Sequence, residues 1–89
     1  MDINEIRQTV LQSLLTTHGK ETMKGVNLNV EPFPDNDDIV ILEIKNDAIR
    51  IKERIGFRIS NFKKTSVPKN FFIEMLFENF FSYLKKSIL

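Results

Sequence analysis

Four carboxylate side chains fall close together in the first half of the chain. Glu31 is followed by Asp35, Asp37 and Asp38, and carboxylate oxygens are the ligands that Ca²⁺ and Mg²⁺ prefer. An EF-hand loop would also need a glycine at its sharp turn and a distal bidentate glutamate, and this segment has neither. The pattern favours a solvated turn of short polar side chains over a metal site. We therefore expect no bound metal and no cofactor.

The single histidine, His18, lies next to Gly19 near the end of a predicted helix. General acid–base chemistry needs a second group within hydrogen-bond reach, and the neighbouring sequence supplies none. We interpret His18 as a side chain that caps the helix and complements its dipole. Three glycines and no cysteine also leave no phosphate-cradling loop and no zinc-ligand spacing. The sequence therefore predicts a protein that is not an enzyme, with no catalytic residues.

Charge is distributed unevenly along the chain. Residues 1–47 carry nine acidic and four basic side chains, whereas residues 48–89 carry three acidic and nine basic ones. Seven basic residues lie between positions 50 and 69, where Glu53 is the one acid: Arg50, Lys52, Arg54, Arg58, Lys63, Lys64 and Lys69. Such a basic strip suits phosphate groups or an acidic partner, because each neutralised phosphate releases counterions. A solvated face answered by acids elsewhere is the competing interpretation, so nucleic-acid binding is our alternative hypothesis.

The first element that positions these groups is a helix near the N-terminus. Apolar residues recur at the spacing of one helical face: Ile3, Ile6, Val10, Leu11, Leu14 and Leu15. Residues such as Gln8, Gln12 and Ser13 fall on the opposite, polar face. Asp2 suits the N-cap position, and Gly19 suits the position just past the helix end.

Three strands are predicted next. Residues 26–30 and 39–45 alternate between apolar and polar side chains, as strands with one buried face do. Asn46 and Asp47 stand where a two-residue hairpin turn would go. Residues 49–59 continue the alternation, but Glu53 falls on the apolar side. We therefore expect a bulge or break near residues 53–56; a short helix over residues 47–55 is the competing interpretation.

A long helix over residues 69–88 is predicted to close the chain, after a polar connection over residues 61–70 and a cap from Ser66. Its apolar stripe covers about half of the circumference and comprises Phe72, Ile73, Leu76, Phe77, Phe80, Phe81, Tyr83, Leu84 and Ile88. The stripe is longer than a three-stranded sheet, so we expect a homodimer that buries the surplus; a wide core face within one chain is the competing interpretation. The residues that we expect at its interface are Phe72, Phe77, Phe81 and Tyr83. Glu74, Glu78 and Asn79 in mid-helix exclude a membrane span. The acids share the polar face, where anionic lipid would repel them, which disfavours binding at the membrane surface.

These elements define the expected fold class: a single α+β domain over residues 1–89, in the order helix-strand-strand-strand-helix, with a three-stranded antiparallel meander and both helices on one face. The N-terminal residues show no signal peptide, so we expect a cytoplasmic protein. Residues with AT-rich codons are abundant, and Ala48 is the one alanine. The first functional hypothesis is a protein-interaction module, such as a phage or mobile-element regulator or inhibitor of host machinery.

Overall fold

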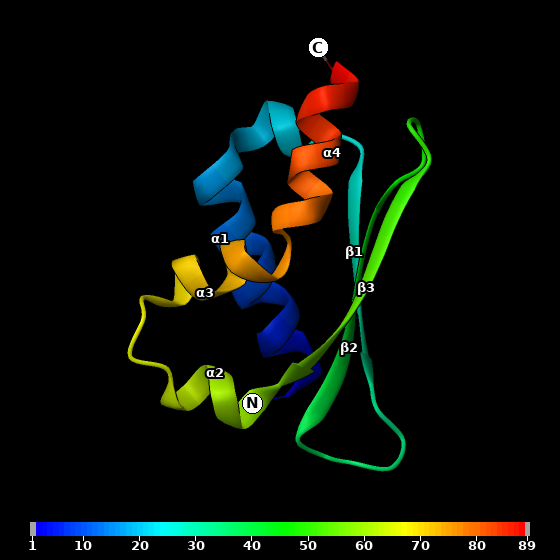
Figure 1. Cartoon of the computed structure of the whole chain (residues 1–89). Helices are drawn as coiled ribbons and strands as arrows, with labels where there is room; N and C mark the ends of the chain where they lie inside the picture. Colours follow the sequence, from blue (N-terminus) through cyan, green and yellow to red (C-terminus); the bar gives the residue numbers. More distant parts are fainter. Residues whose placement is uncertain (1, 89) are drawn as a thin grey trace.

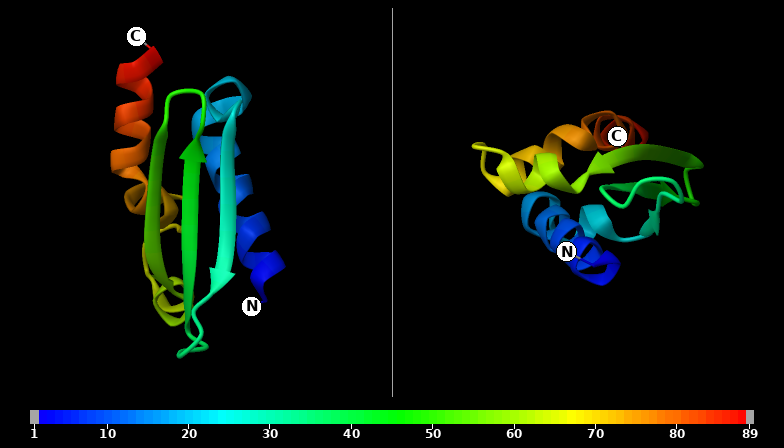
Figure 2. Two further views of the ribbon diagram at one scale, coloured as in Figure 1. Left: turned by 90° about the vertical axis from the view of Figure 1, so that its right-hand side faces the viewer. Right: turned by 90° about the horizontal axis from the view of Figure 1, so that it is seen from below.

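A three-stranded antiparallel sheet organises the protein (Figure 1). The computed structural model describes the backbone of residues 2–88 and the side chains of residues 2–87. The elements are α1 (Ile3–Met23), β1 (Val26–Pro32), β2 (Ile39–Asn46), β3 (Ile51–Arg58), α2 (Ile59–Lys64), α3 (Lys69–Leu76) and α4 (Glu78–Ile88). Figure 2 shows that the long helices all lie on one side of the sheet. The predicted fold class is therefore confirmed.

The strands pair as a meander in the order β1-β2-β3. Alternation along β2 buries Val40, Leu42, Ile44 and Asn46 against the helices. In the register between β2 and β3, Val40 lies opposite Phe57 and Leu42 opposite Ile55. Because side chains alternate between the faces of a strand, this register turns the apolar side chains of both strands toward the helices.

Glu53 does not cause the predicted bulge or break. Strand β3 runs without interruption from Ile51 to Arg58, and Glu53 lies directly opposite Ile44 on the helix side of the sheet. The expectation was wrong because β3 is an edge strand, where a carboxylate can stay partly exposed while its neighbours are buried. Burial nevertheless raises the pKa of Glu53 above its usual value.

The connection between β2 and β3 also differs from the expected two-residue turn. It spans residues 47–50, and the buried Asn46 starts it by accepting a hydrogen bond from the Ala48 N–H at 3.0 Å. Arg50 ends it with a φ of 56°, a left-handed conformation that is uncommon outside glycine. This geometry removes Arg50 from the strand on which it was predicted.

The first helix begins as predicted and is kinked near its end. The Asp2 carboxylate accepts a hydrogen bond from the Glu5 N–H at 2.8 Å, as an N-cap should. Gly19 has a φ of 82° and a ψ of 164°, a backbone region that is essentially restricted to glycine. The positive φ expected there is present, but a further helical turn follows it and ends at Met23.

The C-terminal part of the chain holds three helices where one was predicted. Helix α2 replaces part of the expected polar connection, and Phe77, with a φ of −110° and a ψ of 17°, separates α3 from α4. Pro68 occupies the N-cap position of α3, without a side-chain cap, so the predicted cap from Ser66 was wrong. Helix α3 packs on α1, and Ser13, predicted to face solvent, is only 5% exposed.

The core lies between the sheet and the helices. Side chains from every element contribute to it, and it comprises Ile6, Val10, Leu14, Met23, Val30, Val40, Leu42, Ile44, Phe57, Ile59, Phe62, Ile73, Phe77, Phe80, Phe81 and Leu84. The break at Phe77 lets α3 pack on α1 while α4 packs along β3. Both halves of the predicted helix therefore bury apolar side chains against their own chain.

Candidate interaction surfaces

The basic strip is divided among several elements. Lys52, Arg54 and Arg58 lie on the face of β3 that turns away from the helices. Arg50 lies in the loop before β3, and three lysines lie beyond it: Lys63 and Lys64 on α2, and Lys69 at the start of α3. The structure therefore places only three of the seven basic residues on the sheet face.

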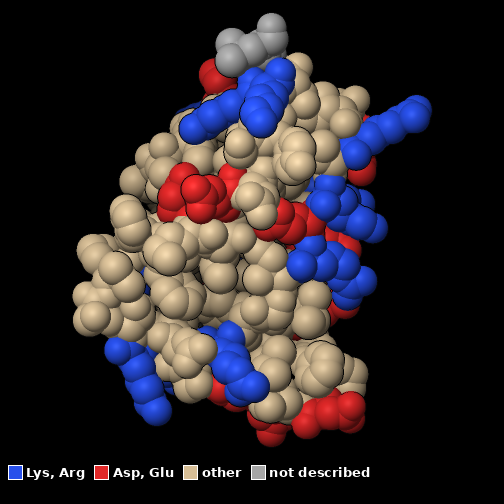
Figure 3. Space-filling view, viewed as in Figure 1, with Lys and Arg blue, Asp and Glu red and all other residues tan. Residues whose placement is uncertain are grey.

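Acidic side chains from the first half of the chain lie beside the basic residues on the sheet face. The carboxylate of Glu43, on the neighbouring strand, lies 3.7 Å from Nε of Arg54, and that of Asp38 lies 3.9 Å from a guanidinium nitrogen of Arg58. Figure 3 shows basic and acidic groups interleaved on the right-hand side of the molecule, over β2 and β3. The sheet face is therefore of mixed charge rather than uniformly positive.

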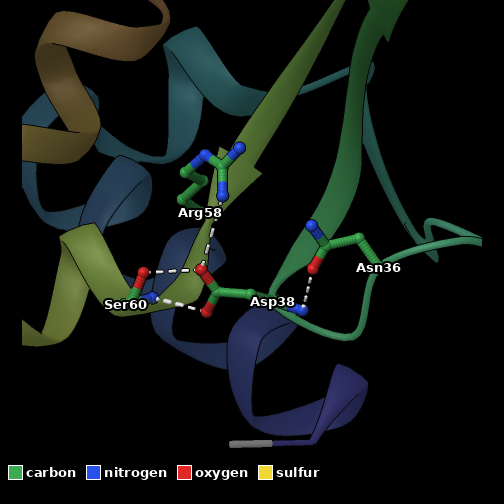
Figure 4. Close-up of polar contacts among 4 residues, drawn as sticks. All are labelled: Asn36, Asp38, Arg58 and Ser60. Atoms are coloured by element: carbon green, nitrogen blue, oxygen red, sulfur yellow. Dashed lines mark hydrogen bonds and ion pairs between the residues drawn. The ribbon is translucent and has the colours of Figure 1, made fainter.

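Asp38 has a structural role that the sequence did not reveal. Its carboxylate accepts hydrogen bonds from the backbone N–H of Ser60, at 2.9 Å, and from the Ser60 hydroxyl (Figure 4). Its backbone carbonyl accepts from the Ile59 N–H at 2.9 Å. The first N–H groups of a helix lack partners within the helix, and α2 has no cap from its own N-cap residue, Arg58. Asp38, in the loop between β1 and β2, therefore caps α2.

The pKa of Asp38 follows from this arrangement. The hydrogen bond from the Ser60 hydroxyl is the main cause that lowers the pKa of the Asp38 carboxyl below its usual value. The Ser60 N–H and the positive charge of Arg58 act in the same direction, while burial opposes them. Asn36 holds the loop by accepting a hydrogen bond from the Asp38 N–H at 2.8 Å. Within residues 2–88, no three potential metal ligands gather into a cluster.

The residues predicted to mediate self-association occupy different environments. Phe77 and Phe81 are fully buried, and Phe72 is half-buried against the rings of Phe57 and Phe62. Tyr83, in contrast, is 62% exposed on α4. Three of these four side chains therefore contact the protein's own core. The side chain of Ile88, also assigned to the stripe, lies outside the described residues.

Helix α3 exposes two large apolar residues that the sequence analysis missed. Phe71 and Met75 are each 58% exposed, and their four-residue spacing puts them on the same side of the helix. Figure 3 shows that the left-hand side of the molecule, over α3 and the loop before it, is largely free of charged groups. The signal was present in the sequence, because Phe71 and Met75 fall outside the stripe assigned to the core.

His18 has a partner from a distant part of the chain. Its Nε2 atom lies 2.8 Å from a carboxylate oxygen of Glu74 on α3 and forms an ion pair with it when the imidazole is protonated. The two atoms do not meet the geometry of a hydrogen bond with each other, and neither has another hydrogen-bond partner in the described part of the chain. The imidazole also stacks on the Phe81 ring, with centroids 3.7 Å apart. The expected helix-capping role was therefore wrong: His18 ties α1 to α3 and α4.

A hollow lies beside Glu53, the carboxyl group whose pKa is raised by burial. It encloses about 300 Å³ between β3 and α4 and is lined by Arg50, Ile51, Lys52, Glu53, Phe80 and Tyr83. A carboxylic acid in a hollow can serve general acid–base chemistry, but catalysis also needs a second reacting group in a defined position. The hydrogen bonds and ion pairs of the described residues connect Glu53 to no such group.

No protein-family model matches the chain, and comparison with curated proteins and with solved structures also gave no match. No helix within residues 2–88 is long and apolar enough to span a membrane.

Proposed function

We propose that this chain is a non-enzymatic protein-interaction module, of the kind that a phage or mobile element uses to regulate or inhibit host machinery. The observation that carries the proposal is the exposed pair Phe71 and Met75 on α3. Surface apolar residues that occur singly need no explanation, whereas adjacent large ones commonly mark a binding surface.

The energetic argument rests on the size of the two side chains. Complete burial of a phenylalanine or methionine side chain stabilises by about 1.5–3 kcal/mol. Phe71 and Met75 each leave 58% of their surface in water, so each would contribute about 1–2 kcal/mol on contact with an apolar partner surface. Such anchors commonly dominate the free energy of a protein interface.

Affinity capture from the native host, with nuclease treatment, tests this function. We expect the wild-type protein to retain a partner that is lost when Phe71→Glu and Met75→Glu are combined, because the two carboxylates would be buried without counter-charges. A matched control, Asn70→Glu with Asn79→Glu, adds the same charge at exposed polar positions on α3 and α4 and should retain the partner. Equal retention by both double variants would refute the α3 surface.

Nucleic-acid binding through the basic strip remains the second candidate. It is supported by Lys63 and Lys64, which are exposed and form no ion pair in the described residues. Retention on a nucleic-acid column at about 50 mM salt, where phosphate contacts are strong, tests it. We expect Lys63→Glu with Lys64→Glu to abolish retention and Arg50→Glu with Arg54→Glu to weaken it, because Arg54 lies beside Glu43. No retention of the wild type would eliminate this candidate.

A further inference from the structure

One end of the molecule combines an apolar hollow with charges of both signs. At this end lie the start of α1, residues 33–38 between β1 and β2, and α2; together they are called the loop end. Figures 1 and 2 show the N-terminus, the β1–β2 loop and α2 at this end, with the C-terminus at the opposite end.

The hollow of the loop end is mainly apolar. It encloses about 240 Å³, and seven of its ten lining residues are apolar: Ile3, Ile6, Pro32, Phe33, Ile39, Val40 and Ile59. The other three are Asp2, Asn36 and Asp37. Phe33, one of these lining residues, has 38% of its surface exposed. An apolar centre with polar groups around it is the usual anatomy of a protein interface.

Charges of opposite sign occupy the two sides of the loop end. Asp35 and Asp37 are exposed on the β1–β2 loop, and Lys63 and Lys64 are exposed on α2. Across residues 2–88, none of the four forms an ion pair with another side chain. Asp38 differs from its neighbours because its carboxylate is held by Ser60. The positive charge of Lys64 also acts on the Asp38 carboxylate, whose pKa it helps to lower. None of the four groups is held in an ion pair within the described residues, so each can contact another molecule.

We propose that the loop end is a surface for self-association, through which a second copy of this chain docks. In a two-fold symmetric pair the same surface serves both copies, and any contact from one to the other is made twice. Asp35 and Asp37 of each copy then face Lys63 and Lys64 of the other. Asp37 also lines the hollow, so these contacts pair its carboxylate while the other copy covers the apolar lining. A foreign partner carrying charge of one sign would be attracted by one side of this end and repelled by the other. The two-signed pattern is thus self-complementary, which favours a second copy as the occupant.

The dimensions of the protein limit the area of this contact. The molecule measures 38 × 27 × 19 Å, so a contact across its end covers at most about 500 Å² on each copy, or about 1,000 Å² in total. Stable interfaces start near this area and weak ones lie below it. We therefore expect a reversible dimer with a dissociation constant in the micromolar range or above.

Light scattering and sedimentation over a concentration series test the surface by charge exchange. We expect the wild-type mass to rise above 10.4 kDa with concentration at about 50 mM salt and to fall back at about 500 mM. Lys63→Glu with Lys64→Glu, and separately Asp35→Lys with Asp37→Lys, should each weaken self-association at least tenfold. A 1:1 mixture of the two double variants should restore dimers, because each contact then again joins opposite charges.

A matched control changes the same number of charges at the other end of the molecule. Lys85→Glu with Lys86→Glu, in the last turn of α4, should leave association within about threefold of wild type. Circular dichroism of every variant confirms that it is folded. A wild type that stays at 10.4 kDa up to about 0.5 mM, or a mixture that stays monomeric, would overturn the proposal. Neither outcome bears on the function proposed for α3, which the Phe71 and Met75 variants test separately.

Discussion

Phe81 and Tyr83 lie two residues apart on α4, but replacing each with alanine should have very different consequences. Phe81 is 2% exposed, and its ring stacks on His18 and meets the edge of Phe80 at 5.2 Å between centroids. Tyr83 is 62% exposed. The comparison therefore separates a side chain that holds the protein together from one that is free to contact a partner.

The magnitudes follow from burial. Removal of a buried phenylalanine side chain costs about 3–5 kcal/mol, because a cavity remains in addition to the lost transfer free energy. The total stability of an 89-residue protein is about 4–13 kcal/mol, so Phe81→Ala should remove a large part of it. The melting temperature should fall by at least about 12 °C, at 4 °C or more for each kcal/mol. Tyr83→Ala should change the free energy of unfolding by no more than about 0.5 kcal/mol, as exposed positions do.

Urea denaturation followed by circular dichroism gives both values from the shift in midpoint at constant slope. A loss below about 1 kcal/mol for Phe81→Ala would refute the reasoning, because it would mean that the Phe81 ring is not packed against His18 and Phe80. A loss for Tyr83→Ala as large as that for Phe81→Ala would refute the assigned exposure. Phe81→Glu should likewise unfold the domain, whereas self-association through Phe81 would require this variant to stay folded as a monomer.

Three further predictions concern charge and backbone geometry. In thermal melts at different pH, Glu53→Gln should stabilise the protein at neutral pH and have no effect near pH 3. Burial raises the folded-state pKa of Glu53, so its carboxylate lowers stability only as pH rises through that pKa. Asp38→Asn should destabilise at neutral pH, because the lowered pKa means that the carboxylate stabilises the fold above its unfolded pKa. As pH falls through the folded-state pKa of Asp38, which lies below the unfolded-state pKa, the wild type should lose this stabilisation. A difference in stability between wild type and variant that does not change with pH would contradict the role of the carboxylate as a cap. Gly19→Ala should lower the free energy of unfolding by about 1–3 kcal/mol, because alanine is strained at the φ of 82°. Gly56→Ala, where a Cβ would meet nothing within 4 Å, should be neutral or stabilise by up to about 1 kcal/mol; equal melting temperatures for the two glycine variants would refute the strain at Gly19.

The strands were predictable because their signal is local. Alternation along residues 39–45 assigns the buried face of β2 without knowledge of any partner, and the structure confirms it. The break at Phe77 was not predictable, because the apolar stripe continues through it; α3 and α4 separate in order to pack on α1 and β3 respectively. Helix propensity and periodicity carry no information on that choice.

The candidate surfaces were predictable only in part. The positions of Lys52, Arg54 and Arg58 on one strand face follow from alternation alone and agree with the register. Their acidic neighbours come from β2 and from the β1–β2 loop, and such pairings across the fold leave no trace in local sequence. For the same reason, the contact between His18 and Glu74, which joins α1 to α3, was not predictable from the sequence.

The cap that Asp38 provides for α2 links the stability of two segments that are distant in the chain. A six-residue helix is too short to persist by itself in water, and two of its first N–H groups are bonded to Asp38. When the β1–β2 loop opens, α2 loses these partners, so the two segments should open together as one cooperative unit. Native-state hydrogen exchange would then show the same opening free energy for the amides of Ile59, Ser60 and Ile39, the last of which bonds to Asn36 in the loop. A short helix that looks local is in this respect a long-range feature, and its formation must wait until the β1–β2 hairpin has closed.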